Sequence, residues 1–171
     1  HPNFGGDAEI LGWEPRFWAR EQVQLKSEPD AGLASATVDL KTLSEFDFPQ
    51  FLGKHRDGIV NSLKLNQDWK ANPPKLMWKQ PIGEGWSGFS AVNGYAITQE
   101  QQGEMECVTC YEIETGKLVW IWSAARRHED IVGLGKVGPR ATPTIDDGLV
   151  YVMGGTGVLD CIDGSDGTLV W

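Results

Sequence analysis

A segment of eleven residues occurs twice in the second half of the chain, and this repeat constrains the fold more than any other feature. The first copy reads Cys-Tyr-Glu-Ile-Glu-Thr-Gly-Lys-Leu-Val-Trp and ends at Trp120. The second copy reads Cys-Ile-Asp-Gly-Ser-Asp-Gly-Thr-Leu-Val-Trp and ends at Trp171, 51 residues later. Cys, Gly, Leu, Val and Trp keep the same offsets in both copies. A period of this length predicts that one supersecondary unit occurs at least twice.

Each copy has the pattern of a β-hairpin. Residues 106–113, which overlap the first copy, are rich in β-branched and aromatic side chains, and these favour a pleated strand. Residues 114–117 then supply a tight turn, in which Gly116 accepts a positive φ angle without steric strain. Gly167 has the same place in the second copy. The Leu-Val-Trp run after each turn is predicted to begin the returning antiparallel strand.

A second hairpin is predicted ahead of each copy. In both places two short apolar runs flank Asn-Gly or Asp-Gly, the dipeptides that most strongly predict a tight hairpin turn. The runs are residues 89–92 and 95–98 around Asn93-Gly94, and residues 142–145 and 149–153 around 146–148. Each unit is therefore predicted to contain four antiparallel strands, and the fold class to be all-β. A single unit of this kind cannot bury both of its faces, so units stack as the blades of a β-propeller.

The repeat also carries a family resemblance. Thr-Gly-Lys-Leu-Val-Trp, ending at Trp120, resembles the tryptophan-docking motif of propellers built from pyrroloquinoline-quinone (PQQ) repeats. Residues 85–88 and 138–144 resemble the starts of the first strands of such blades, and residues 47–58 resemble the lead-in of the bacterial envelope subgroup. The resemblance covers residues 47–171. It implies that the tryptophan ending each unit wedges between neighbouring blades, and the residues expected to dock the blades are Trp78, Gly116, Trp120, Gly167 and Trp171.

The blade pattern divides the chain. Residues 1–46 are predicted to form an irregular linker, because residues 21–40 lack a clear period and residues 27–42 contain Pro29, Gly32 and several Ser, Thr and Ala. Residues 47–171 are expected to form a partial propeller. Its parts are a closing strand at 74–82, a blade at 86–123 and a blade at 140–171.

The closing strand predicts an open ring. Trp78 precedes Trp120 by 42 residues, which is a full blade period, but no three strands precede Trp78. We therefore expect this strand to complete a last blade whose inner strands come from further along the sequence. Two blades and one strand cannot close a ring of 4 to 8 blades, so the parent protein is expected to be several hundred residues longer.

The charge and hydropathy of this chain argue against two partners, nucleic acids and membranes. The net charge is −9 with no cluster of basic residues to offset it, and such a chain repels phosphate backbones, so no nucleic-acid binding is expected. No run of 18 apolar residues occurs, so membrane anchoring would require sequence upstream of His1.

The three cysteines are predicted to be structural. Cys107 and Cys110 have the spacing of redox and zinc motifs. Within a strand, however, residues three apart point to opposite faces and lie about 10 Å apart, too far for a disulfide. Cys161 matches Cys110 in the repeat. Small buried core residues are therefore the favoured interpretation.

Two loops are predicted to lie at the same end of the blades, because both return the chain to one face. They are the second-to-third-strand loop at 99–104 and the inter-blade loop at 123–139. Function concentrates on loops held by a rigid scaffold. The inter-blade loop contains the charged run Arg126, Arg127, His128, Glu129 and Asp130. Contiguous residues rarely converge on one ion, so a solvated loop is favoured over a metal site.

Two residues near the predicted channel mouth are candidates for binding a cofactor. Arg140 could clamp carboxylates such as those of PQQ, and Trp86 could stack on a flat ring. The alternative, which the sequence favours, is that Arg140 pairs with a neighbouring acid and Trp86 packs between blades.

Two functions follow as expectations. The first is a non-catalytic propeller of the periplasm or cell envelope that binds or scaffolds another envelope protein, similar to the outer-membrane assembly lipoprotein class. The second is part of a PQQ-dependent alcohol or sugar dehydrogenase, whose family uses PQQ, Ca²⁺, a catalytic Asp and often a disulfide of adjacent cysteines. No catalytic residue is assigned in this chain, because none of its carboxylates matches that Asp or a calcium ligand and no two cysteines are adjacent.

Overall fold

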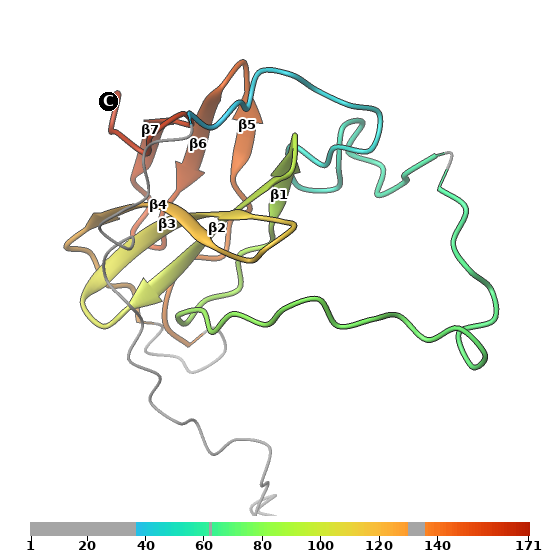
Figure 1. Ribbon diagram of the computed structural model, residues 1–171. Helices are drawn as coiled ribbons and strands as arrows, with labels where there is room; N and C mark the ends of the chain where they lie inside the picture. Colours follow the sequence, from blue (N-terminus) through green and yellow to red (C-terminus); the bar gives the residue numbers. More distant parts are fainter. Residues whose placement is uncertain (1–36, 62, 130–135) are drawn as a thin grey trace, which may run out of the picture.

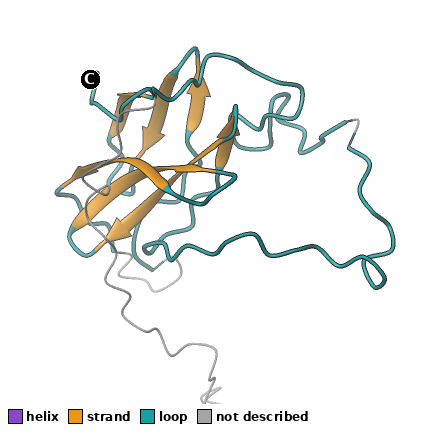
Figure 2. Ribbon diagram, viewed as in Figure 1, coloured by secondary structure: helices purple, strands orange, loops and turns teal. Residues whose placement is uncertain are grey.

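Two antiparallel β-sheets make up the computed structural model, which describes residues 37–61, 63–129 and 136–171 (Figures 1 and 2). The first sheet has the order β1-β2-β3-β4, and the second has the order β5-β6-β7. The described residues contain no helix, and hence no helix that could span a membrane. The predicted all-β class is confirmed for this part of the chain. The strands are β1 (Ser90–Val92), β2 (Tyr95–Gln102), β3 (Met105–Glu112), β4 (Leu118–Ala124), β5 (Thr144–Asp146), β6 (Leu149–Met153) and β7 (Leu159–Asp163).

The predicted Asn-Gly and Asp-Gly hairpins are both present. Asn93 and Gly94 join β1 to β2 with φ angles of 48° and 84°. Asp147 and Gly148 join β5 to β6 with φ angles of 45° and 82°. Two successive positive φ angles define the type I′ turn, whose twist matches that of the paired strands. The turn residues therefore fix the register of both hairpins.

The two sheets differ at their outer edges. In the first sheet, β4 pairs with β3 along its whole length. In the second sheet, the residues that would form a fourth strand pair with β7 only through an isolated bridge between Ile162 and Leu169. The amide of Cys161 donates to Trp171 O at 2.9 Å, and the amide of Val170 donates to Cys161 O at 2.8 Å. The second sheet is thus three-stranded, with residues 169–171 lying along β7.

The hydrophobic core lies where the two sheets face each other. Its buried members come from both sheets and from a segment ahead of them. Trp120 of β4 belongs to this core and is 5% exposed. The buried members are Val38, Leu40, Val92, Ile97, Val108, Cys110, Trp120, Ile145, Val150, Val152 and Ile162.

The segment 38–49, which we call the strap, contacts both sheets. The amide of Val38 donates to Ser165 O at 3.3 Å, after β7. Phe48 pairs with Ala91 of β1, with two backbone hydrogen bonds of 2.8 and 2.9 Å. The amide of Ile145 in β5 donates to Pro49 O at 2.8 Å. Figure 1 shows the strap running from the β6–β7 side of the second sheet across to β1.

The strap changes the interpretation of the predicted linker at 1–46. Residues 1–36 lie outside the described part of the chain. Residues 37–46 form no strand or helix, in keeping with an irregular segment. Val38 and Leu40 are nevertheless buried in the core, at 3% and 2% exposed. An apolar pair in a polar stretch gives no sequence signal for a contact with such distant residues.

One further prediction differs from the structure. Residues 99–102 were predicted to be a loop, but β2 continues to Gln102, and only Gly103 and Glu104 form the turn. Polar side chains can line a buried strand when each finds a hydrogen-bond partner. Residues 74–82 form no strand among the described residues. The predicted closing strand was expected to pair with strands from further along the sequence, so it stays a prediction.

Candidate functional site

Two loops of the first sheet meet at one end of β3. The turn Gly103–Glu104 connects β2 to β3, and residues 125–129 follow β4. Glu106 near the start of β3 is paired with Ala124 at the end of β4. Both loops therefore leave the sheet at the same end of its strands. The prediction that these two loops share an end is confirmed. We call this surface, residues 103–104 and 125–129, the rim.

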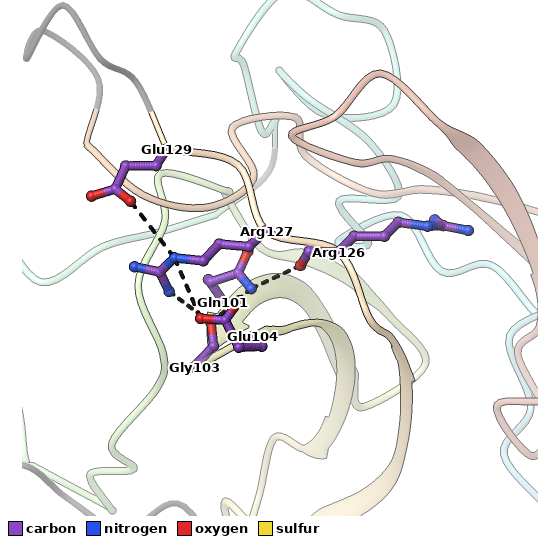
Figure 3. Close-up of polar contacts among 6 residues, drawn as sticks. All are labelled: Gln101, Gly103, Glu104, Arg126, Arg127 and Glu129. Atoms are coloured by element: carbon purple, nitrogen blue, oxygen red, sulfur yellow. Dashed lines mark hydrogen bonds and ion pairs between the residues drawn. The ribbon is translucent and has the colours of Figure 1, made fainter.

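Arg127 ties the two loops of the rim together (Figure 3). Its Nη1 donates to Gly103 O at 2.7 Å. Its Nε lies 3.8 Å from Glu104 Oε1 and 3.8 Å from Glu129 Oε2. The side chains of the two acids are 82% and 66% exposed, so these ion pairs are weak and open to solvent. The hydrogen bond to Gly103 is therefore the main contact that positions Arg127.

Gln101 supports the rim from inside the sheet. This side chain is 2% exposed, and its Nε2 donates to Gly103 O at 3.0 Å and to Arg126 O at 2.9 Å (Figure 3). One amide group thus holds both loops. Its Oε1 is buried without a hydrogen-bond partner among the described residues. No sequence signal predicts this role, because a Gln in a polar run is indistinguishable from a loop residue.

Arg126 points away from Arg127 and joins the two sheets (Figure 3). Its Nη1 and Nη2 donate to the carboxylate of Asp160 in β7 at 2.5 and 3.2 Å. The guanidinium also lies 5.6 Å from the ring centre of Trp122. The hydrogen bond to Asp160 raises the pKa of Arg126. The predicted charged loop is therefore only partly solvated, since one of its arginines is anchored in the sheet interface.

Buried carboxylates near the rim have structural partners. Glu106 is 2% exposed, and its Oε2 accepts a hydrogen bond from the amide of Gly155 at 2.7 Å. Glu100 is 1% exposed and accepts hydrogen bonds from the amide of Gly83 and from Gln102 Nε2. Both carboxylates thus complete the hydrogen bonding of backbone that packs against the first sheet.

The structure brings the segments of the two cofactor candidates side by side. The amide of Trp86 donates to Pro139 O at 2.9 Å, next to Arg140. Arg140 is exposed, and Trp86 is 64% exposed. The favoured expectation for Trp86 was packing between blades, whereas its indole lies largely in solvent beside the described sheets.

Two of the tryptophans expected to dock the blades, Trp78 and Trp120, each make the same kind of contact with a glycine turn. Trp120 Nε1 donates to Gly164 O at 3.0 Å, and a Cβ on Gly167 would lie 2.8 Å from the indole. Trp78 Nε1 donates to Ile113 O at 2.6 Å, and a Cβ on Gly116 would lie 2.5 Å from the indole. In both cases the acceptor is three residues before a glycine with positive φ. Each turn therefore seats an indole only because its glycine has no side chain. Trp171, at the end of the second copy, is 57% exposed, with its ring 6.3 Å from that of Tyr151.

The cysteines are buried and unpaired. Cys110 lies in the core between the sheets, whereas Cys107 is paired with Glu100 on the opposite face of the first sheet. Burial, followed by the nearby carboxylate of Glu100, raises the pKa of Cys107 to about 12. Burial also raises the pKa of Cys110. A thiol held protonated in this way is a poor nucleophile and a poor metal ligand.

The described residues contain no cluster of metal-binding side chains. Within 37–61, 63–129 and 136–171, no three His, Cys, Asp or Glu side chains form a group that could hold a metal ion. Asp130 of the His-Glu-Asp run lies outside these ranges. A shallow hollow of about 240 Å³ lies beside the strap, and its lining residues are Glu45, Asp47, Phe48, Lys54, His55, Ile59, Val60 and Asn61.

Comparison with known proteins adds no family to this description. A scan of the chain against protein-family models finds no match, and a search of curated proteins finds no similar sequence. The resemblance to PQQ repeats therefore depends on the residues and motifs quoted above.

Proposed function

We propose that this chain is part of a quinoprotein-like β-propeller of the cell envelope that binds or scaffolds a partner protein. The observation that carries the proposal is the repeated contact between an indole and a glycine turn. Trp78 and Trp120 sit on successive turns in the same way. Units related by one repeated contact add in a regular series, which is how blades are arranged around a propeller axis.

The rim is the surface we propose for partner binding. Its two loops are held by the buried Gln101 and by Arg127, so little loop ordering accompanies binding. Arg127 lies between the exposed carboxylates of Glu104 and Glu129. Mixed charges on a fixed scaffold are suited to the polar part of a protein interface, where they orient the partner.

A PQQ-dependent dehydrogenase is the second candidate, and one observation favours it. The hydrogen bond from Trp86 to Pro139 places an exposed aromatic residue beside the exposed Arg140. A flat ring and a guanidinium together suit a planar carboxylated cofactor such as PQQ. The buried acids described above already serve backbone groups, so the catalytic base would have to come from other residues.

Site-specific photo-crosslinking tests the binding proposal. A photoreactive amino acid replaces Glu104 on the rim of the full-length protein, and in a matched variant it replaces Asp166, an exposed residue of the turn before Trp171. We expect one discrete adduct with an envelope protein from position 104 and none from position 166. Equal labelling from both positions, or no adduct from either, contradicts a binding function of the rim.

Quinone binding separates the two candidates. PQQ and Ca²⁺ are added to the full-length protein, and dye-linked oxidation of alcohols and sugars is followed. Saturable PQQ binding with turnover overturns the scaffold proposal, and a Trp86→Ala variant then shows whether this indole holds the cofactor. Failure to bind PQQ removes the dehydrogenase candidate.

A further inference from the structure

Residues 50–70, which we call the arm, follow the strap and expose large apolar side chains. The structure describes residues 50–61 and 63–70 of the arm, and Figure 1 shows the second of these ranges running outside both sheets. Six large apolar side chains of the arm are between 42% and 70% exposed, namely Phe51, Leu52, Ile59, Leu63, Leu65 and Trp69. Exposed apolar side chains gathered in one short segment indicate a contact surface.

The base of the arm is a hydrogen-bonded turn. The amide of Gly53 donates to Gln50 O at 2.9 Å, and the amide of Gly58 donates to Leu52 O at 2.9 Å. The ring of Phe48 in the strap lies against Gly53, since a Cβ at that glycine would be 2.6 Å from the ring. Leu52 has a φ of 62°, which strains the backbone of a residue with a side chain, and it is 42% exposed. Neither the backbone conformation nor burial in the core therefore accounts for a leucine at this position.

A second turn presents Trp69. The amide of Asp68 donates to Asn66 Oδ1 at 2.9 Å, and the amide of Ala71 donates to Asp68 Oδ1 at 2.9 Å. The amide of Asn72 donates to Asp68 O at 2.9 Å. Trp69 lies within this turn and is 58% exposed. The exposed apolar side chains are thus carried by two turns, each stabilised by hydrogen bonds between neighbouring residues.

The charge of the arm is opposite to that of the rest of the chain. Residues 50–70 contain four Lys or Arg and two Asp, which is a net charge of +2. The whole chain has a net charge of −9, so the residues outside the arm carry −11. The four cations, Lys54, Arg56, Lys64 and Lys70, are all exposed. The average charge of the chain, which argues against anionic partners, therefore does not describe the arm.

We infer that the arm is a peripheral membrane contact, which inserts its exposed apolar side chains between the headgroups of a bilayer that contains anionic lipids. Lys and Arg next to Trp, Phe and Leu are typical of segments that lie in a membrane interface. A protein partner is disfavoured, because three of the four cations are lysines and lysine is depleted in protein interfaces. The acidic sheets oppose the contact little, since charges are largely screened beyond about 8 Å at physiological ionic strength.

The position of the arm leaves the rim free to bind a partner. Asp47 Oδ1 in the strap accepts a hydrogen bond from the amide of Asn93, just before β2, at 3.2 Å. The arm begins directly after the strap, whereas the rim follows Gln102 at the other end of β2. A membrane at the base of the arm therefore lies at the end of the first sheet opposite to the rim. The inference goes beyond the proposed function and does not depend on it.

An environment-sensitive fluorophore on the arm of the full-length protein tests the inference. A nitrobenzoxadiazole dye is attached to the new thiol of Leu65→Cys and, in a matched control, of Lys117→Cys, an exposed position between β3 and β4. Vesicles of equal parts phosphatidylcholine and phosphatidylglycerol are then added. We expect the emission at position 65 to rise several-fold and shift to shorter wavelength as the dye leaves water. The emission at position 117 should stay unchanged.

Every other response of the dye overturns the inference. Emission at position 65 that is already high and blue-shifted without vesicles shows that the protein itself covers the arm. Equal changes at positions 65 and 117 show non-specific adsorption. A response to soluble polyglutamate without a response to vesicles indicates an acidic protein as the partner, and no response to either removes the contact.

Flotation with the same vesicles separates the apolar and the charged contributions. We expect Trp69→Ala to weaken binding about 10-fold, because an inserted aromatic side chain is lost, and Lys64→Gln to weaken it about 5-fold. Val158→Ala and Lys117→Gln change exposed side chains outside the arm and should leave binding unchanged. Binding that neither arm variant weakens, or that the control variants weaken equally, overturns the inference. The result is independent of the crosslinking at position 104, so the arm and the rim can fail separately.

Discussion

Trp120 and Trp78 make the same contact in very different surroundings. Both indoles donate Nε1–H to a backbone carbonyl and lie on a glycine turn. Trp120 is 5% exposed, comes from the paired strand β4 and is part of the core between the sheets. Trp78 is only partly buried and comes from an unpaired segment. The comparison shows that the turn sequence determines the contact, whereas the neighbouring sheet determines how much stability the contact adds.

We call the contact of each indole with its glycine turn, together with the polar contacts around it, a junction. The junctions at Trp120 and at Trp78 differ in these polar contacts. The junction at Trp120 includes the ion pair of Arg126 with Asp160 and the hydrogen bond from Gly155 to Glu106. The junction at Trp78 has the hydrogen bond from Gln80 to Gly116 O. A partly buried ion pair is costly to break, whereas a single neutral hydrogen bond adds less.

Truncating the two tryptophans should separate the junctions most clearly. We expect Trp120→Ala to lower the free energy of unfolding by about 3–5 kcal/mol, because it opens a cavity in the core. Trp78→Ala should lower it by about 1–2 kcal/mol, as expected for a partly exposed side chain. Urea denaturation followed by circular dichroism measures both losses. Equal losses would show that the two indoles have equivalent surroundings.

The glycines beneath the indoles provide a smaller perturbation with a matched control. A Cβ at Gly167 would lie 2.8 Å from Trp120, at a φ of 82°. We expect Gly167→Ala to destabilise by about 2–3 kcal/mol, since about 1–2 kcal/mol of backbone strain adds to the clash. Gly157 has a φ of 85° and no atom within 4 Å of such a Cβ, so Gly157→Ala reports the backbone strain alone. A loss at position 157 as large as at 167 would remove the steric explanation.

Neutralising Asp160 should weaken the Trp120 junction less than the truncation of Trp120 does. The side chain of Asp160 is 6% exposed and that of Arg126 is 25% exposed. Asp160→Asn is expected to cost about 1–3 kcal/mol, because it leaves a partly buried guanidinium without its counter-charge. Glu104→Gln, in an exposed pair, should change stability by less than about 0.5 kcal/mol. Denaturation of the two variants side by side tests the difference.

Lowering the pH should destabilise the turn that contacts Trp120. Asp163 accepts hydrogen bonds from the hydroxyl and the amide of Ser165 at 2.6 and 2.9 Å, and these lower the pKa of Asp163. A carboxyl group with a lowered folded-state pKa adds stability above its unfolded pKa of about 4, and this is lost as the pH falls through the folded value. In Asp163→Asn the decline of stability below about pH 4 should be shallower. Stability measured at pH 7 and at several acid pH values checks this, with Glu114→Gln as a charge-matched control. An unchanged acid dependence contradicts a role for Asp163.

Local sequence signals predicted the strands well, and non-local partners account for the misses. Asn93-Gly94 and Asp147-Gly148 fixed two hairpins, because their backbone conformation depends only on the residues themselves. The polar run at 99–102 was mistaken for a loop. Two of its side chains donate hydrogen bonds to distant groups, since Gln99 Nε2 donates to Ala141 O and Gln101 Nε2 donates to Arg126 O. Such partners are invisible in a window of sequence.

The candidate site was predictable in its position and not in its contacts. Strand order alone placed the two rim loops at one end of the first sheet, as observed. The split between the neighbouring Arg126 and Arg127, one joining the sheets and the other tying the loops, was not predictable. It depends on which acceptors the second sheet brings near, and only the packed structure determines this.

The strap has a consequence for the order in which the protein assembles. Residues 38–49 leave the ribosome before any strand of either sheet, yet Val38 bonds to Ser165 and Leu40 packs against Gly164. Contacts between such distant positions form late, because a long loop must close first. During synthesis Val38 and Leu40 therefore remain exposed, and nascent chains with exposed apolar segments are prone to aggregate. We therefore expect a segment made before either sheet to dock only after both sheets have been synthesised.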